Sequence, residues 1–195
     1  MLCHAANEPG SDDSAAFRAL LRRQLPAITT RLEVTLDKLR VKQESFDEPL
    51  VPLNLWWADL VRRFEDKAWI CFTSAAASSD SAVPVALFNS VLDNLLSNMA
   101  AKRQSETDLS VSVHVETVQS GVAITVSDNG SAINKSIQAQ LLRGPVPSED
   151  GLGIGLYQVA KQAESLGYRL KLVESRDGCV CFELAPLATT VTGGN

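Results

Sequence analysis

The chain has 195 residues, a net charge of −5, 45% hydrophobic residues and 21% charged residues. This composition is that of a folded domain with a sizeable core and a short appendage. The acidic balance argues against a broad nucleic-acid-binding surface, and no run of 18 apolar residues that could span a membrane occurs in the sequence. Because no basic segment followed by an apolar one opens the chain, we expect no secretory signal.

The first quarter of the chain predicts a polar tail followed by a long helix. Residues 1–13 are polar, and we expect them to be frayed or disordered. Apolar residues recur at helical spacing through residues 14–46, which predicts a helix that Pro26 either kinks or restarts. Two prolines, Pro49 and Pro52, then indicate a linker with a short edge strand.

Residues 47–187 predict a second and larger unit in which helices and strands are segregated. The predicted helices cover residues 55–67, 84–103 and 152–166, with a weaker helix over 133–143. The predicted strands cover residues 69–73, 109–118, 122–126, 168–175 and 179–184, and residues 188–195 form a C-terminal tail. Elements that do not alternate strictly between strand and helix favour an α+β sandwich.

Two motifs in this unit place polar side chains at defined positions. Asn94 and Asn98 lie four residues apart on a predicted helix, so they share one face. An amide oxygen is a hard ligand, of the kind that Mg²⁺ prefers. Asp128 ends a predicted strand at a turn where Gly130 permits a tight backbone, and its carboxylate could accept hydrogen bonds from an exocyclic amine.

A third motif, Gly151-Leu152-Gly153-Ile154-Gly155-Leu156, opens the last predicted helix. Glycines at alternate positions let backbone N–H groups approach a bulky anion, and the positive end of the helix dipole favours that anion. A dinucleotide-binding fingerprint would need a glycine in place of Leu156 and a strand directly before the loop, and this chain has neither. Each motif alone also fits an ordinary helix surface or turn, so their order carries the argument.

The three motifs in this order resemble the ATP-binding fold shared by sensor histidine kinases, Hsp90, MutL and gyrase B. The resemblance covers about Leu53 to Pro186. It implies a Bergerat-type, two-layer α/β sandwich, with a mixed, mostly antiparallel sheet covered on one face by helices. It implies that ATP and magnesium are bound by the following residues: Asn94 at the phosphates, Asn98 at the metal, Asp128 at adenine, and Gly130, Gly151, Leu152, Gly153, Ile154, Gly155 and Leu156 around the nucleotide.

Within this superfamily the chain resembles the sensor histidine kinases most. Hydrolysing members and anti-sigma-type serine kinases place a glutamate where this chain has Asn94, which cannot act as a general base. The resemblance therefore implies a protein-histidine kinase that transfers the γ-phosphoryl group of ATP to a histidine outside this chain. Two departures from the family pattern, Ala132 for glycine and Val180 for threonine, leave open a non-catalytic scaffold that has lost nucleotide binding.

The resemblance also predicts partners and location. Residues 14–46 resemble the second helix of a dimerisation and phosphoacceptor hairpin, and neither His4 nor His114 has the surroundings of an acceptor. We therefore expect the hairpin of the parent kinase as the direct partner and a response regulator receiver domain as the indirect one. The parent would be a homodimer, whereas this fragment would dimerise weakly or not at all. The expected location is cytoplasmic, with attachment of the parent to the inner membrane left open.

The four cysteines indicate no metal or redox site. Cys3, Cys71, Cys179 and Cys181 lack the spacing of metal ligands. A metal or redox protein is the competing interpretation of these cysteines. We favour reduced thiols, some of them buried.

Overall fold

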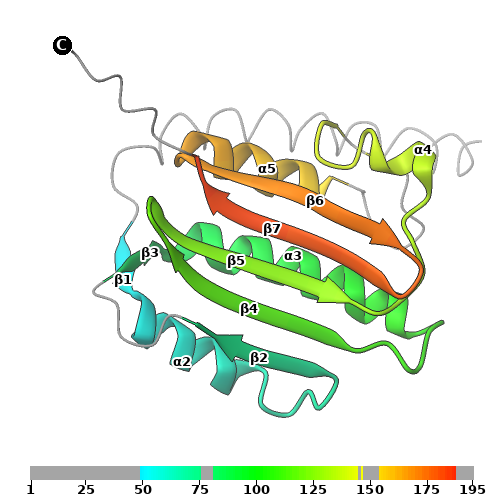
Figure 1. Cartoon of the computed structure of the whole chain (residues 1–195), viewed down its shortest axis with the longest axis horizontal. Coiled ribbons are helices and arrows are strands. Elements are labelled where there is room, and N and C mark those ends of the chain that lie inside the picture. The colour runs from blue at the N-terminus through cyan, green and yellow to red at the C-terminus, as the bar shows by residue number, and fades with distance from the viewer. Residues whose placement is uncertain (1–48, 76–80, 145, 147–153, 188–195) are drawn as a thin grey trace, which may run out of the picture. The chain divides into compact units, whose positions relative to one another are not determined.

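The computed structural model describes residues 49–75, 81–144, 146 and 154–187, all of them in the unit that spans residues 41–195 (Figure 1). The predicted helix at 14–46, both predicted tails and most of the glycine motif lie outside the described residues. The helices are α2 (Leu53–Arg63), α3 (Val85–Arg103), α4 (Lys135–Gln138) and α5 (Gly155–Ser165). The strands are β1 (Leu50–Pro52), β2 (Ile70–Ser74), β3 (Ala82–Pro84), β4 (Val111–Val118), β5 (Gly121–Asp128), β6 (Tyr168–Arg176) and β7 (Cys179–Pro186).

Five strands form the main sheet in the order β2-β4-β5-β7-β6. Only the pairing of β2 with β4 is parallel, and the pairings β4–β5, β5–β7 and β6–β7 are antiparallel. Tight turns join β4 to β5 and β6 to β7, at the two places where the sequence predicts hairpins. The mixed, mostly antiparallel sheet is therefore confirmed.

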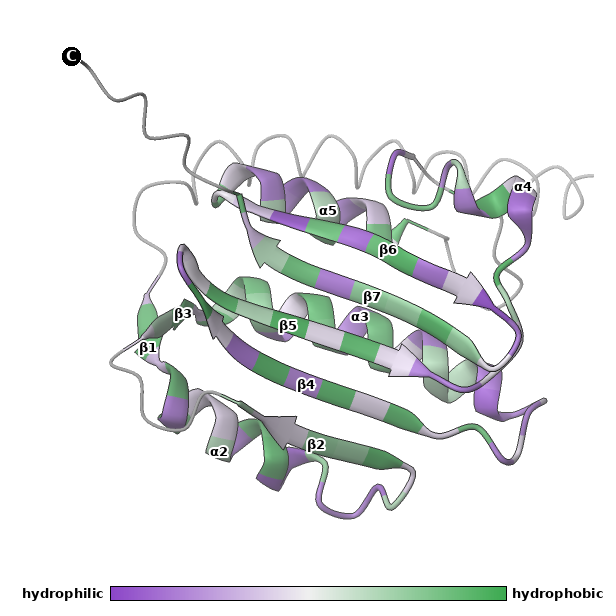
Figure 2. Cartoon of the chain, viewed as in Figure 1, coloured by the Kyte–Doolittle hydropathy of each residue, from purple (hydrophilic) through white to green (hydrophobic). Residues whose placement is uncertain are grey.

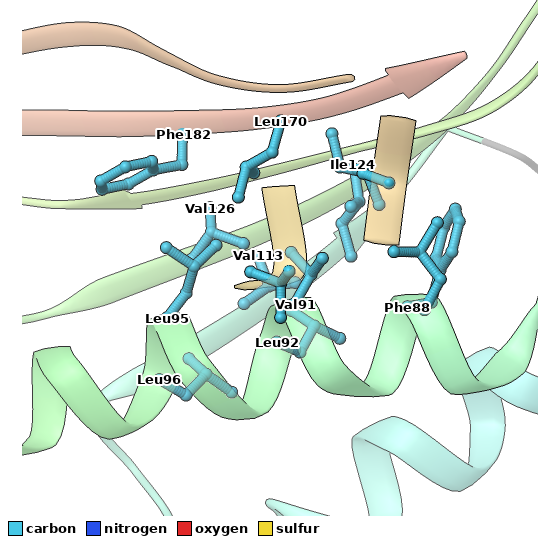
Figure 3. Close-up of a cluster of buried hydrophobic side chains, with 14 of the residues drawn as sticks. Phe88, Val91, Leu92, Leu95, Leu96, Val113, Ile124, Val126, Leu170 and Phe182 are labelled. Carbon is cyan, nitrogen blue, oxygen red and sulfur yellow. The ribbon is translucent and has the colours of Figure 1, made fainter. Parts of the chain in front are cut away.

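The core lies between this sheet and the helices α3 and α5, which Figure 1 shows on the same side of the strands. Along α3, apolar residues repeat at steps of three and four, and these side chains are buried: Phe88, Val91, Leu92, Leu95, Leu96 and Met99. They meet alternate residues of the strands, among them Val113, Ile124, Val126, Leu170 and Phe182 (Figure 3). The helical period of α3 and the alternation along the strands each turn one apolar face to the core. The result is the two-layer sandwich that the sequence predicts.

The other face of the strands is more polar, and Figure 2 shows the alternation of hydropathy along them. Ser112, His114, Thr125 and Glu183 are partly exposed there. His114 Nδ1 lies 2.9 Å from the Thr73 hydroxyl on the neighbouring strand β2. The surroundings of His114 are thus those of an ordinary sheet residue.

Aromatic contacts fix α2 and the start of β6 against the start of α3. The Phe88 ring is edge-on to Trp56 of α2 and to Tyr168 of β6, with centroid separations of 5.3 Å and 5.5 Å. The Trp56 indole N–H also donates to Asn89 Oδ1 at 3.0 Å. Phe88, which has no exposed surface, therefore ties together three elements.

The structure differs from the sequence prediction at three elements. The segment before α3 contains β3, which the sequence analysis did not predict and which pairs with β1 in an antiparallel ribbon. The helix predicted over 133–143 is only the four residues of α4, although Ile137, Leu141 and Leu142 of that segment pack against the core. The last helix begins at Gly155 rather than at Leu152, with Ile154 as its N-cap residue.

Candidate functional site

Asp128 ends β5 and is the one polar or charged residue among the described residues that is buried, with 6% exposure. Alternation along β5 places it on the face of Ile124 and Val126, so its side chain points to the helix layer. Its Oδ1 accepts the Gly130 N–H at 2.9 Å, which closes the turn predicted from Asp-Asn-Gly. A buried carboxylate requires further compensation, and α3 supplies it.

The ammonium group of Lys102 compensates this charge. Lys102 Nζ lies 2.8 Å from Asp128 Oδ1 and 2.7 Å from the Ser131 carbonyl oxygen, to which it also donates. The sequence analysis missed Lys102. The available signal was its position one helical turn after Asn98, on the face that Asn94 and Asn98 share.

Glu106 completes the polar cluster at the end of α3. Its carboxylate accepts the Ser131 backbone N–H at 3.0 Å and the Ser131 hydroxyl. The hydroxyl hydrogen bond holds the pKa of Glu106 below its usual range. Lys102 and Glu106 carry opposite charges, and both thus hold Ser131 near the C-terminal end of α3.

The β6–β7 hairpin holds the backbone that follows Asp128. Gly178 N–H donates to the Gly130 carbonyl oxygen at 2.9 Å, and Ala132 N–H donates to Asp177 Oδ1 at 2.9 Å. Ile133 N–H donates to the Ser175 hydroxyl oxygen at 3.0 Å. Ala132, one of the two departures from the family pattern, is exposed in this segment.

The second departure, Val180, lies directly beside Asp128. The two residues are cross-strand partners in the β5–β7 pairing, and Val180 is 2% exposed. Its isopropyl group cannot donate a hydrogen bond, so the carboxylate receives none from this neighbour.

Asn94 meets the start of α5. A Cβ atom on Gly155 would lie 2.0 Å from Asn94 Oδ1, so the two helices approach this closely only because residue 155 has no side chain. Asn94 Nδ2 donates to the Ser90 carbonyl oxygen at 2.8 Å, which fixes the amide in place. The side chains of Ile154 and Leu156 on either side of Gly155 are buried, while Gly151, Leu152 and Gly153 lie outside the described residues.

Asn94, Asn98 and Lys102 form a column along one face of α3, at steps of four residues. Asn98 is exposed in the middle of the column. At 1.5 Å of rise per residue, the ends of the column are about 12 Å apart. A ligand along this column would reach from Asp128 to the first turn of α5, so the structure brings the predicted asparagines, Asp128, Gly130 and Gly155 into one region.

No cluster of three or more His, Cys, Asp or Glu side chains in the described part of the chain could hold a metal ion. Cys71, Cys179 and Cys181 are free thiols. Cys179 Sγ lies 3.3 Å from Glu174 Oε2, and this hydrogen bond raises the pKa of the Cys179 thiol. Within the same described ranges, no helix has the length and apolarity that crossing a bilayer requires.

Comparison with known proteins places the chain in a family. Residues 84–189, more than half of the chain, match the family described as "Histidine kinase-, DNA gyrase B-, and HSP90-like ATPase". No curated protein matches significantly in sequence.

Several solved structures share the fold. The catalytic domain of histidine kinase ThkA is 20% identical, with a TM-score of 0.57 over 72% of this chain and 96% of that one. Histidine kinase AdeS of Acinetobacter baumannii is 16% identical, with a TM-score of 0.58 over 93% and 88%. Full-length ShkA in complex with AMPPNP is 17% identical, with a TM-score of 0.57 over 93% and 41%. By its sequence match, the chain belongs to the histidine kinase-, DNA gyrase B- and HSP90-like ATPase family.

Proposed function

We propose that this domain is the ATP-binding catalytic domain of a two-component sensor histidine kinase. The observation that carries the proposal is the buried carboxylate of Asp128, held at the end of β5 in an ATPase-family fold. The similarity of the fold to histidine kinase catalytic domains supports this branch of the family, and ShkA was solved with the ATP analogue AMPPNP. The absence of an ionisable group at Asn94 supports the same branch, because a serine kinase or a hydrolase would need a base there.

The residues of the site fit an adenine nucleotide in their chemistry. Asp128 accepts hydrogen bonds only, which suits an exocyclic amine, and it is shielded from water as a base-binding group would be. Asn94, next to the first turn of α5, would lie at the phosphate end of the site. Asn98, which is exposed on the same face of α3, would supply an amide oxygen to magnesium.

Bound ATP supplies the γ-phosphoryl group. The chain's own residues position the nucleotide, and they neutralise the phosphate charge through the metal they hold, rather than act as bases. Asp128 would orient the base, Asn98 would hold the metal against the phosphates, and Asn94 would face them. The acceptor would be a histidine on the helix hairpin of the parent kinase. A receiver domain of a response regulator would then take the phosphoryl group, and these steps would occur in the cytoplasm.

A second candidate is a scaffold of the same fold that binds no nucleotide. Two specific observations favour it. Lys102 already bonds to Asp128, and Val180 offers no hydrogen bond beside it. The two candidates make opposite predictions for nucleotide binding by the unmodified chain.

Calorimetric titration with AMPPNP, with and without magnesium, tests both candidates. We expect the wild type to bind with the help of magnesium, and we expect Asp128→Ala to weaken binding by about tenfold to a hundredfold, because a buried amine is left unpaired. Asp93→Ala is the matched control, since Asp93 is an exposed carboxylate on α3 that pairs with Arg63. Unchanged affinity in a folded Asp128→Ala variant would refute the role of Asp128, and a wild type that binds no nucleotide would establish the scaffold.

A further inference from the structure

The proposed base-binding carboxylate already has a cationic partner inside the domain. Lys102 Nζ lies 2.8 Å from Asp128 Oδ1, and the Asp128 side chain is 3% exposed while that of Lys102 is 22% exposed. The carboxylate and the ammonium group therefore form an ion pair that is largely withdrawn from water. Breaking such a pair leaves an uncompensated buried charge, which is much more costly than breaking a pair at the surface.

A nucleobase amine is a weaker partner for this carboxylate than Lys102 is. The amine of adenine is neutral, so it can donate a hydrogen bond to Asp128 but cannot neutralise its charge. Because the carboxylate acceptor is ionised, both hydrogen bonds are charge-assisted, but only the ammonium group adds the attraction of an opposite charge, which is strong where water is largely excluded. Lys102 and the Gly130 N–H both bond to Asp128 Oδ1, so in a direct exchange at that oxygen the ammonium group of Lys102 is the favoured occupant.

Lys102 also occupies the space against the turn that follows Asp128. A Cβ atom on Gly130 would lie 2.6 Å from Lys102 Cε and 2.6 Å from its Nζ. The same Nζ donates to the Ser131 carbonyl oxygen at 2.7 Å. The side chain thus has two polar anchors and lies directly on the backbone of Gly130.

Glu106, four residues after Lys102 and just beyond the end of α3, offers Lys102 a second partner. Glu106 Oε2 would lie 2.4 Å from the same Cβ position on Gly130, so both side chains approach the same point. The charge of Lys102 also contributes to the lowered pKa of Glu106, after the larger effect of its hydrogen bond with Ser131. A lysine side chain is flexible, so its ammonium group could leave Asp128 and pair with Glu106 instead.

We propose that Lys102 is an internal latch on the nucleotide site. In the closed state its ammonium group holds Asp128 and Ser131, and in the open state it is released to Glu106 and solvent so that Asp128 can accept a base amine. This inference rests on the proposed function of Asp128, and it makes Lys102 the residue that sets the affinity of this domain for adenine nucleotides. The fraction of open molecules then limits the apparent affinity.

Nucleotide titration of two Lys102 variants tests the latch. Lys102→Met keeps most of the side-chain volume without the charge, and we expect it to bind AMPPNP at least about tenfold more tightly than the wild type. Lys102→Gln keeps a neutral donor for Asp128, and its affinity should lie between the two. Lys161→Met is the matched control, because Lys161 is an exposed lysine paired with Glu164 on α5, and its affinity should equal that of the wild type.

A stability measurement keeps the test decisive. Without nucleotide, Lys102→Met should unfold at a lower urea concentration than the wild type, because Asp128 loses its counter-ion, and AMPPNP should stabilise it more. If Lys102→Met does not fold, Lys102→Gln decides the question by the same titration. A wild type that binds nucleotide while neither folded Lys102 variant gains affinity overturns the latch and leaves the proposed function standing. Failure of the wild type and both variants to bind overturns the proposed function, and the latch with it.

Discussion

The contact between Asn94 and Gly155 predicts that Gly155→Ala destabilises the domain although alanine is the better helix former. A Cβ atom there would lie 2.0 Å from Asn94 Oδ1 and 3.2 Å from Asn94 Cγ, and ordinary van der Waals contact begins at 3.4 Å. The Asn94 amide must therefore move, or α5 must shift away from α3. Either change disturbs a partly buried contact between the two helices.

The magnitude follows from three opposing effects. Forcing an extra methyl group into a packed contact costs about 1–3 kcal/mol of folding free energy. Rotating the Asn94 amide also breaks its hydrogen bond to the Ser90 carbonyl oxygen, which costs about 1 kcal/mol. Alanine in place of glycine in a helix returns at most about 1 kcal/mol. We expect Gly155→Ala to lower the free energy of unfolding by about 2 kcal/mol.

Urea unfolding of a double-mutant cycle measures this effect. Asn94→Ala removes the obstructing oxygen, so the double variant Asn94→Ala/Gly155→Ala should be more stable than the sum of the two single effects. Gly144→Ala is the control, because within the described part of the chain no atom beyond the neighbouring residues lies within 4 Å of its added Cβ, and its stability should stay within about 0.5 kcal/mol of the wild type. A Gly155→Ala variant as stable as the wild type, or a cycle without coupling, would refute the close contact.

Two further changes follow from the same site. Asn98→Ala should abolish the magnesium dependence of AMPPNP binding while keeping most of the affinity seen without metal, and calorimetry at several magnesium concentrations measures it; an unchanged response to magnesium would make Asn98 an ordinary surface amide. Because the Ser131 hydroxyl holds the folded-state pKa of Glu106 below its ordinary value of 4.5, the stabilising effect of Glu106 is present above that pH and is lost as the pH falls through the folded-state pKa. Glu106→Gln should therefore flatten the loss of stability below about pH 4.5 in urea titrations, and a slope equal to that of the wild type would contradict the reasoning.

Periodicity in the sequence predicted the layers of the fold, because the same buried residues set the periodic pattern and the packing of the layers. The buried face of α3 follows from the spacing of Phe88, Val91 and Leu95, and the alternation along β5 follows from residues such as Ile124. Of the β1–β3 ribbon, the prolines indicated the short edge strand near Pro49 and Pro52, where β1 lies, but periodicity could not predict β3. Each strand of the ribbon has three residues, too few to show a period.

The site could be predicted only where local chemistry determined it. Asp128 and Gly130 form the turn that their sequence indicates, because its hydrogen bond joins residues two apart. Lys102 was not predicted, since a lysine near a helix C-terminus is ordinarily solvated, and its partner Asp128 is 26 residues away in sequence. For Gly155 the motif predicted an approach to an anion, and the structure adds an approach to α3. The division of the chain at residue 46 stays a prediction.

The hydrogen bonds between the β6–β7 hairpin and the turn after Asp128 determine when this site can form during synthesis. Asp177 bonds to Ala132 across 45 residues of sequence, and Gly178 bonds to Gly130. A nascent chain released from the ribosome only as far as α5 therefore has the hydrogen bonds of this turn to Asp128, Lys102 and Glu106 but lacks those from the hairpin. Closing such a long loop is slow compared with forming a local hairpin. The site would be completed last, after β7 leaves the exit tunnel, so a truncated translation product would hold the binding turn by fewer hydrogen bonds than the full domain.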